Sequence, residues 1–216
     1  CIRVLAGICS STKTLFACAV PQKGADAEGY AAKNFIDNVL WLGHARLAIR
    51  SDNEPAIVKL VNSAVNVLKL SGTDVTVEGS AEYDPQSNGA AESAVRLVKG
   101  QVRALQVGLE NDIKSHIPVG HPVITWLVRH AAMVRTMHVI GTDGKTAWQR
   151  TRGSTCKLKL VNFGEVTHYK CRSQENGIGQ SGFVLGHRYL VGRRLSHGAP
   201  HIVRSYPAVA YVMPGH

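Results

Sequence analysis

Two acidic side chains, Asp52 and Glu92, stand where they could do chemistry. Asp52 follows the apolar run 45–51 and precedes Pro55, so it falls where a short strand ends and a helix begins. Open α/β sheets place functional residues at such strand ends. Asp52 or Asn53 could equally serve only to cap the helix, because short polar side chains satisfy the free N–H groups of a first turn. This segment alone leaves both interpretations open.

Glu92 is the only acid on a second helix, which the spacing predicts from about 89 to 105 or 108, with Glu92 in its first turn. At about 100° per residue, three bases fall within ~40° of Glu92 on the helix surface: Arg96, Lys99 and Arg103. A carboxylate in a first turn also complements the helix dipole, which is the purely structural interpretation. An acid that binds metal beside cations that bind phosphate is, however, what a phosphodiester site needs.

The elements that must position these acids follow an α/β order. Two short apolar runs with a polar turn between them predict a β-hairpin. Helical spacing then alternates with short, buried strands. The expected elements are strands at 2–8, 15–20, 45–51 and 75–77 and helices at 25–42, 55–70 and 89–108. The order β-β-α-β-α-β-α predicts a three-layer α/β domain.

The chain changes character after residue 109. A polar linker and a helix that opens at Pro122 predict a helical connector over 110–152. Short apolar runs divided by glycines then predict a small β-barrel or sandwich over 153–216, with runs at 158–163, 165–169, 182–185, 189–191 and 209–212. We therefore expect three units: 1–109, 110–152 and 153–216.

The net charge of +10 is confined to one half of the chain. Residues 1–100 hold 10 Lys and Arg and 10 Asp and Glu, whereas 101–216 hold 15 and 5. A basic half favours a polyanionic partner, most simply nucleic acid, although a merely soluble surface would look similar. A hydrophobic content of 44% excludes a disordered chain. No apolar run approaches the ~18 residues of a membrane span.

Other reactive residue types give weaker signals. The five cysteines match no Cys-x-x-Cys zinc pair, and Cys9 and Cys18 lie in apolar runs where a thiol acts as a small hydrophobe. Nine of the ten histidines follow residue 100, without the spacing of a zinc site. Arg129, His130 and Arg135 share one helix and could contact DNA or form an ordinary solvated face. Trp126 and Trp148 are expected to pack rather than to stack on bases.

Two segments resemble a known family. Ser51-Asp52-Asn53-Glu54 and the block from Tyr83 to Ser93, with its Pro-Gln-Ser-Asn-Gly-x-x-Glu core, look like the second and third catalytic blocks of retroviral and retrotransposon integrases. Later segments resemble copia-type retrotransposon integrases: 144–150, 163–164 and 182–186. The resemblance implies an RNase H-like mixed sheet with flanking helices, drawn from a retroelement Pol polyprotein.

The resemblance assigns roles residue by residue. Asp52 is implied to be the second catalytic aspartate and Glu92 the glutamate, both of them metal ligands. Four positions match residues that touch the element's own DNA end: Tyr83, Asn88, Arg96 and Lys99. Arg103 joins them only because it shares their helix face. The family's first aspartate belongs on a strand before 2–8, which is missing here, so we expect a fragment of a longer chain with little or no activity. The 39 residues between Asp52 and Glu92 also exceed the retroviral spacing.

The implied activity is insertion of element DNA into a target. Carboxylate oxygens suit Mg²⁺ or Mn²⁺, and two such ions ~4 Å apart activate the attacking oxygen and stabilise the leaving one. The steps would be 3′-end processing by water and strand transfer by a DNA 3′-hydroxyl. The expected partners are DNA and further copies of the chain, with a nuclear location and no membrane. The alternatives are a non-catalytic DNA-binding remnant of a decayed or domesticated element, and an RNase H-like nuclease.

Overall fold

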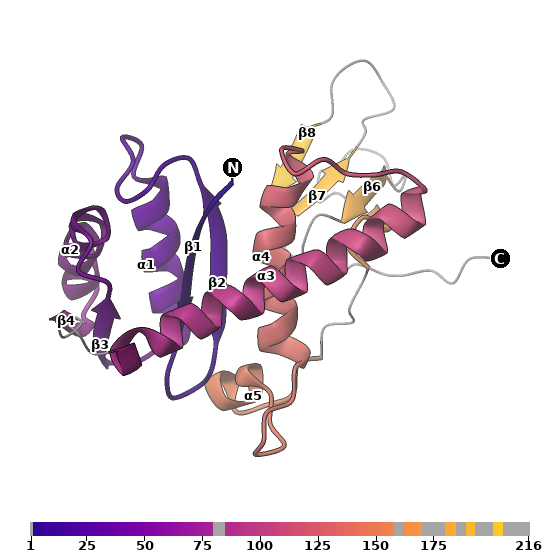
Figure 1. Ribbon diagram of the computed structural model, residues 1–216. Coiled ribbons are helices and arrows are strands. Elements are labelled where there is room, and N and C mark those ends of the chain that lie inside the picture. The colour runs from indigo at the N-terminus through magenta and orange to yellow at the C-terminus, as the bar shows by residue number, and fades with distance from the viewer. Residues whose placement is uncertain are drawn as a thin grey trace, which may run out of the picture.

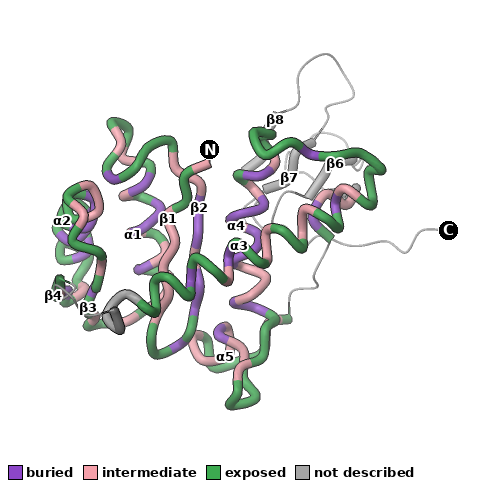
Figure 2. Tube along the Cα trace, in the orientation of Figure 1, coloured by how far each residue is buried: buried purple, intermediate pink, exposed green. Residues whose placement is uncertain are grey.

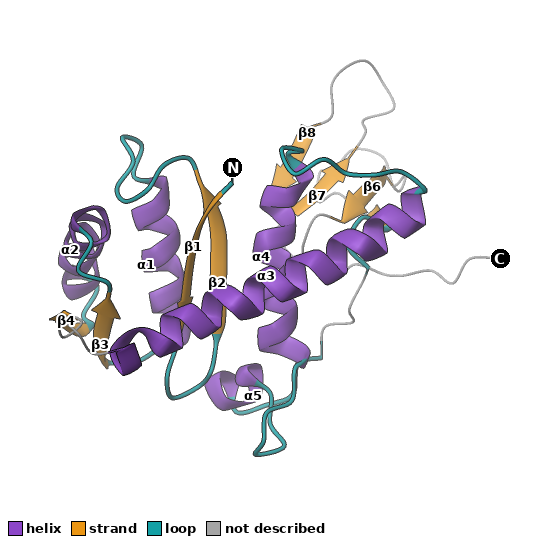
Figure 3. Cartoon of the chain, viewed as in Figure 1, coloured by secondary structure: helices purple, strands orange, loops and turns teal. Residues whose placement is uncertain are grey.

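The computed structural model of the protein describes residues 2–79, 85–157, 162–169, 180–184, 189–192 and 201–204, with side chains left out for 85–88 and from 166 onward. Figure 1 shows its helices and strands from end to end, and Figure 3 separates them by type. Within that described part, no helix combines the length and the apolar character that a bilayer span requires.

The expected hairpin at the start of the chain is confirmed. Strands β1 (Arg3–Ile8) and β2 (Leu15–Val20) pair antiparallel, with Arg3 opposite Val20. The Cys9 N–H donates to the Thr14 carbonyl at 2.9 Å and closes the turn between them. Cys9 therefore belongs to the turn and is half-buried, not a hydrophobe within a strand as the apolar run suggested. Cys18 is buried in β2, as expected.

The second pair of strands is parallel. Strands β3 (Arg46–Ser51) and β4 (Asp74–Gly79) are joined by helix α2 (Pro55–Leu70), which begins at the proline that the sequence indicated. The expectation of a buried strand at 45–51 was wrong, since Ile49 is the only buried residue of β3. The physical reason is that only one face of β3 is covered: Leu47 and Ile49 pack into the cluster with α1 and α2, whereas Arg46, Ala48 and Arg50 on the other face are exposed.

Helix α1 (Tyr30–Leu42) starts five residues later than the spacing predicted. The Asp26 carboxylate accepts the N–H groups of Tyr30 and Ala31 at 2.8 Å each, so the segment before Tyr30 acts as a cap. These bonds, first of all the one from Ala31, lower the pKa of Asp26. Helices α1 and α2 bury one apolar cluster against both sheets: Ala31, Phe35, Val39, Ile49, Leu60, Val61, Ala64, Val65, Leu68 and Val75.

Helix α3 (Pro85–Ile113) is longer than predicted at both ends. Proline suits the first position of a helix, because its missing N–H has no partner there in any case. The prediction that Glu92 lies in the first turn was therefore wrong, since it is the eighth residue of α3. The dipole effect fades beyond the first turn, so this interpretation of Glu92 loses its physical basis.

Helix α4 (Val123–His138) joins α3 on the other face of the hairpin. Their shared cluster is Leu15, Ala17, Ala94, Val98, Val128 and Ala132. In a second apolar cluster, Phe163 packs against both helices together with Leu109, Ile117, Ile124 and Leu127. The expected three layers are thus present around β1–β2, and Figure 2 shows buried positions on both sides of the hairpin.

Two features of the second half were not predicted. The short helix α5 (Ala147–Arg152) begins with a capping box, in which Thr146 accepts from the Gln149 N–H at 3.1 Å and Gln149 accepts from the Thr146 N–H at 2.7 Å. The Thr-x-x-Gln spacing was the available signal. Strand β8 (His201–Arg204) was also missed.

A separate small β-domain over 153–216 remains a prediction, but four strands after residue 165 form one antiparallel sheet. Its strands run in the order β5-β6-β7-β8, with β5 (Val166–Tyr169), β6 (Gln180–Val184) and β7 (Tyr189–Gly192) lying on three of the predicted apolar runs. The run at 209–212 and most of 158–163 lie outside the described residues. Closure of this sheet into a barrel remains a prediction.

Thr136 offers a test of how α4 is held on the hairpin. Its buried hydroxyl accepts the Leu15 N–H and donates to the Leu15 carbonyl, each at 3.0 Å. Replacing Thr136 by Val keeps the shape but leaves both backbone groups of Leu15 without that partner. We expect a loss of about 2–4 kcal/mol in the free energy of unfolding, measured by urea denaturation.

Thr125→Val is the matched control, because the Thr125 hydroxyl is exposed and donates only to the Pro122 carbonyl. It should cost less than about 1 kcal/mol. Equal losses in the two variants would show that the contact between Thr136 and Leu15 stabilises the fold no more than an exposed hydrogen bond does.

Candidate nucleic-acid interface

Helix α3 carries two stripes of opposite character. The apolar stripe is Ala94, Val98, Val102, Leu105 and Leu109, with Ala94 and Val98 exposed by 0% and 2%. The charged stripe is Glu92, Arg96, Lys99 and Arg103, all exposed. Glu92, Arg96 and Arg103 each precede a member of the apolar stripe by two residues, which is about 200° around a helix. Burying the apolar stripe against α4 and the hairpin therefore turns the charged stripe toward solvent.

The three cations of this stripe are available to an external anion. Three other bases of the first half form ion pairs: Lys23 with Glu54 at 2.7 Å, Arg46 with Asp74 at 2.8 Å and Arg50 with Glu78 at 2.7 Å. Among the residues that the structure describes, Arg96, Lys99 and Arg103 form no ion pair. Like charges three and four residues apart destabilise a helix by roughly 0.2–0.5 kcal/mol per pair. A bound phosphate would relieve that repulsion.

Asp52 lies on a different element, in the exposed link between β3 and α2. The N-cap of α2 is Glu54, which makes no capping hydrogen bond and pairs with Lys23 instead. Asp52 is thus not the cap of this helix. With the described part of the chain its carboxylate forms no hydrogen bond or ion pair, so it is open to a ligand from solvent.

The two acids have the donor chemistry of a site for a hard divalent cation, but they do not complete one. Magnesium favours carboxylate oxygens and needs several ligands in octahedral geometry. Across the described ranges, no three His, Cys, Asp or Glu side chains gather as a metal-binding group. Two further predicted contacts cannot be placed beside them. Tyr83 lies outside the described residues, and of Asn88 only the helical backbone is described.

Burial settles the predicted alternatives on α4 for His130 only, and for Arg129 and Arg135 both remain predictions. His130 is exposed by only 2% and packs against Phe163, with 5.2 Å between ring centroids, so it does not face a partner with Arg129 and Arg135. Trp148 packs against Trp41 at 5.6 Å between ring centroids. The expectation that Trp148 is a packing residue is confirmed.

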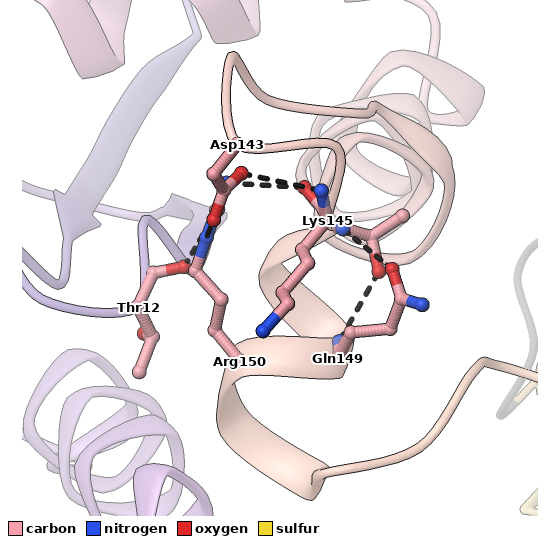
Figure 4. A network of polar contacts seen from close by, with 6 residues as sticks. Thr12, Asp143, Lys145, Gln149 and Arg150 are labelled. Carbon is pink, nitrogen blue, oxygen red and sulfur yellow. Dashed lines mark hydrogen bonds and ion pairs between the residues drawn. The ribbon is translucent and has the colours of Figure 1, made fainter.

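Helix α5 is tied to the hairpin turn by a polar network, drawn in Figure 4. The Arg150 guanidinium pairs with Asp143 and donates to the Thr12 carbonyl at 3.2 Å and the Lys145 carbonyl at 3.0 Å. The Thr14 and Thr151 hydroxyls share a hydrogen bond of 2.8 Å. This network ties α5 to the turn between β1 and β2, and no pattern in the sequence predicted it.

Comparison with known proteins places the fold. No protein-family model and no curated protein matches this sequence. The cryo-EM structure of the simian T-cell lymphotropic virus intasome in complex with PP2A regulatory subunit B56 gamma contains a similar chain, at 15% identity and a TM-score of 0.51 over 99% of this chain and 74% of that one. The fold is that of a retroviral integrase.

Two further solved structures are similar at lower scores. The catalytic core domain of BIV integrase is 19% identical, with a TM-score of 0.46 over 69% of this chain and 85% of that one. The HTLV-2 integrase catalytic core domain in complex with magnesium is 14% identical, with a TM-score of 0.42 over 71% and 84%. At these identities the likeness concerns the fold alone, and scores below 0.5 add nothing to it.

The pair of Asp143 and Arg150 predicts a dependence of stability on pH. The Arg150 hydrogen bond, followed by the Lys145 N–H, holds the pKa of Asp143 well below its usual range. A carboxylate with a depressed pKa stabilises the fold above its unfolded pKa of about 3.9, and this contribution is lost as pH falls toward the folded value. Asp143→Asn should therefore lower Tm at neutral pH, and by progressively less in acid.

The measurement is thermal unfolding by circular dichroism from about pH 7 to about pH 2. Asp37→Asn, at an exposed position of α1, controls for the loss of one negative charge. A deficit for Asp143→Asn that stays constant across this range would contradict the role of the ion pair.

Proposed function

We propose that this chain is part of a copia-type retrotransposon integrase, which binds DNA and, in the full-length protein, carries out 3′-end processing and strand transfer. The observation that carries the proposal is the exposed stripe of α3, where one acid stands in line with three cations that form no ion pair with the described part of the chain. An integrase-type fold and the block from Tyr83 to Ser93 support it. The expected division into 1–109, 110–152 and 153–216 belongs to the same proposal.

In this proposal the stripe binds the backbone of the element's DNA end. Arg96, Lys99 and Arg103 repeat at three- and four-residue steps, so their charges form a line about 10 Å long on the helix. Such a line follows a strand of phosphates, and binding releases the counterions that the phosphates hold. The contacts would position DNA without reading its sequence.

Asp52 and Glu92 would hold Mg²⁺ or Mn²⁺. When bound, the metal would polarise the phosphodiester and activate the attacking oxygen. The two carboxylates would orient the metal, and the cations beside Glu92 would hold the phosphates. Neither β1 nor β2 carries an acidic residue that could add a third carboxylate. We therefore expect residues 1–216 by themselves to bind metal weakly and to show little or no activity.

A second candidate function is a non-catalytic DNA-binding remnant of such an element. It is favoured by the lack of three gathered metal donors in the described ranges. The two candidates differ in the sequence upstream of Cys1, where an enzyme requires an aspartate on a strand. Nuclear location, assembly into multimers and DNA binding by the basic residues after 153 are further parts of the proposal. A nuclease of the same fold would cleave DNA without strand transfer.

Neutralising the stripe tests the DNA interface. The triple variant Arg96→Gln, Lys99→Gln, Arg103→Gln should bind duplex DNA at least about tenfold more weakly at low salt. The slope of log K against log salt should fall by up to about 2.7, because each lost phosphate contact removes ~0.9. Fluorescence anisotropy with a labelled duplex measures both.

The matched control is Lys33→Gln, Lys59→Gln, Lys69→Gln, which removes the same charge from exposed positions on α1 and α2. It should change the slope much less. If both triples weaken binding equally, DNA is held by the overall charge and the stripe is not the interface.

Glu92→Gln tests the catalytic assignment in the full-length protein. With a labelled element end and Mg²⁺, this variant should lose strand transfer by ~10³-fold or more, because the amide cannot serve as a charged metal ligand. DNA binding should persist, since Arg96, Lys99 and Arg103 remain. Glu28→Gln, at an exposed loop position, is the control. Strand transfer that persists in Glu92→Gln would refute the role of Glu92.

A further inference from the structure

The turn between β1 and β2 holds a thiol in a polar setting. The Cys9 Sγ lies 3.2 Å from the Ser11 Oγ and 3.4 Å from the His44 Nε2. Ser11 belongs to the same turn, whereas His44 lies between α1 and β3, 35 residues along the chain. The fold therefore brings a nucleophile and an imidazole together from separate elements. Cys9 and His44 are both half-buried, so the pair is still reachable from solvent.

The surroundings of Cys9 favour its anionic form. Burial raises the pKa of the thiol, but hydrogen bonds from Ser11, from the side chain and N–H of Thr12 and from His44 outweigh it, and the pKa falls to about 6. Cys18 in the adjacent strand shows the opposite case, because burial raises its pKa to about 11. The two cysteines of one hairpin thus differ in charge at neutral pH.

The hairpin turn is held in place by its neighbours. The Cys9 carbonyl accepts the Lys13 N–H at 2.8 Å, and Thr12 is buried. Arg150 of α5 donates to the Thr12 carbonyl and also forms an ion pair with Asp143. The charged and titratable groups around the turn are thus His44, Lys13, Arg150 and Asp143. Contacts from α5 therefore hold the turn in place, which keeps the Ser11 hydroxyl beside the sulfur.

We propose that Cys9 and His44 form a reactive thiolate site, at which small soft electrophiles modify the protein. With a haloacetamide the step is a simple displacement. The thiolate sulfur attacks the methylene carbon, the new C–S bond forms as the carbon–halogen bond breaks, and halide leaves with the electron pair. No proton has to move, because the thiolate is the reacting form, and the His44 Nε2 stabilises it in the tautomer that carries the ring proton there. The site is independent of the proposed DNA chemistry.

The test is alkylation of the folded protein by iodoacetamide, followed peptide by peptide with mass spectrometry across a range of pH. The rate at Cys9 should reach half its plateau near pH 6, whereas the same residue in urea should do so near the ordinary thiol value of about 8.5. At about pH 6 the native thiol should react roughly tenfold faster than the unfolded one, after allowing for the lower nucleophilicity of a less basic thiolate.

Two variants separate the pair from a merely exposed thiol. His44→Ala should move the midpoint at Cys9 upward, and Ser11→Ala should do the same. His121→Ala, at an exposed position before α4, should leave it unchanged. Cys18 is the internal check on folding, because a buried thiol exposed by 4% stays unmodified only while the hairpin is intact. A native midpoint equal to that in urea, or one that His44→Ala does not move while Cys18 stays protected, overturns the proposal.

Discussion

The buried contact between Thr136 and Leu15 is the constraint on which the placement of α3 depends. Leu15 begins β2, and its N–H and C=O point away from β1, toward the outer edge of the hairpin. An open strand edge must be paired or covered, and here one hydroxyl of α4 satisfies both groups. Once α4 is fixed on that edge, its residues Val128 and Ala132 pack against Ala94 and Val98 of α3. The orientation of α3 follows from that packing, and with it the exposure of Glu92 and its three cations.

The electrostatics of α3 show why such a stripe points to a partner. A helix gains little from a row of like charges, and Arg96, Lys99 and Arg103 repel one another at helical spacing. Elsewhere in the first half, Lys23, Arg46 and Arg50 are each offset by a nearby acid. The net charge of zero over residues 1–100 therefore conceals an uneven distribution, with ion pairs on the strands and around α2 and, on α3, Arg96 and Lys99 without an ion pair among the described residues. In the proposed function, a bound polyanion neutralises these charges, so their mutual repulsion is replaced by favourable binding free energy.

The first four strands form two separate sheets, β1–β2 and β3–β4, and β3 carries a further set of exposed residues. Strands β1 and β3 each pair along one edge among the described residues, and α1 and α2 form one apolar layer beneath both sheets. The strand that the family resemblance places ahead of 2–8 was expected to carry the first catalytic aspartate. The helix layer covers the face of β3 that carries Leu47 and Ile49, so the alternate face is exposed. This is the physical reason that Arg46 and Arg50 could take exposed acids as partners.

The sequence by itself determined the order of elements and the chemistry of the candidate site. Apolar periodicity and the positions of Gly and Pro were sufficient for β-β-α-β-α-β-α, and a shared helix face was sufficient to group Glu92 with Arg96, Lys99 and Arg103. Apolar periodicity did not give the first residues of two helices. The Asp26 carboxylate caps the start of α1, and Pro85 is the first residue of α3. Three features are visible only in the tertiary structure. His130 is buried, Thr136 hydrogen-bonds to Leu15, 121 residues away in the chain, and His44 lies beside Cys9, 35 residues away. Local spacing fixes which side chains share a face, because helix and strand geometry are periodic, whereas contacts between distant segments depend on how the layers pack.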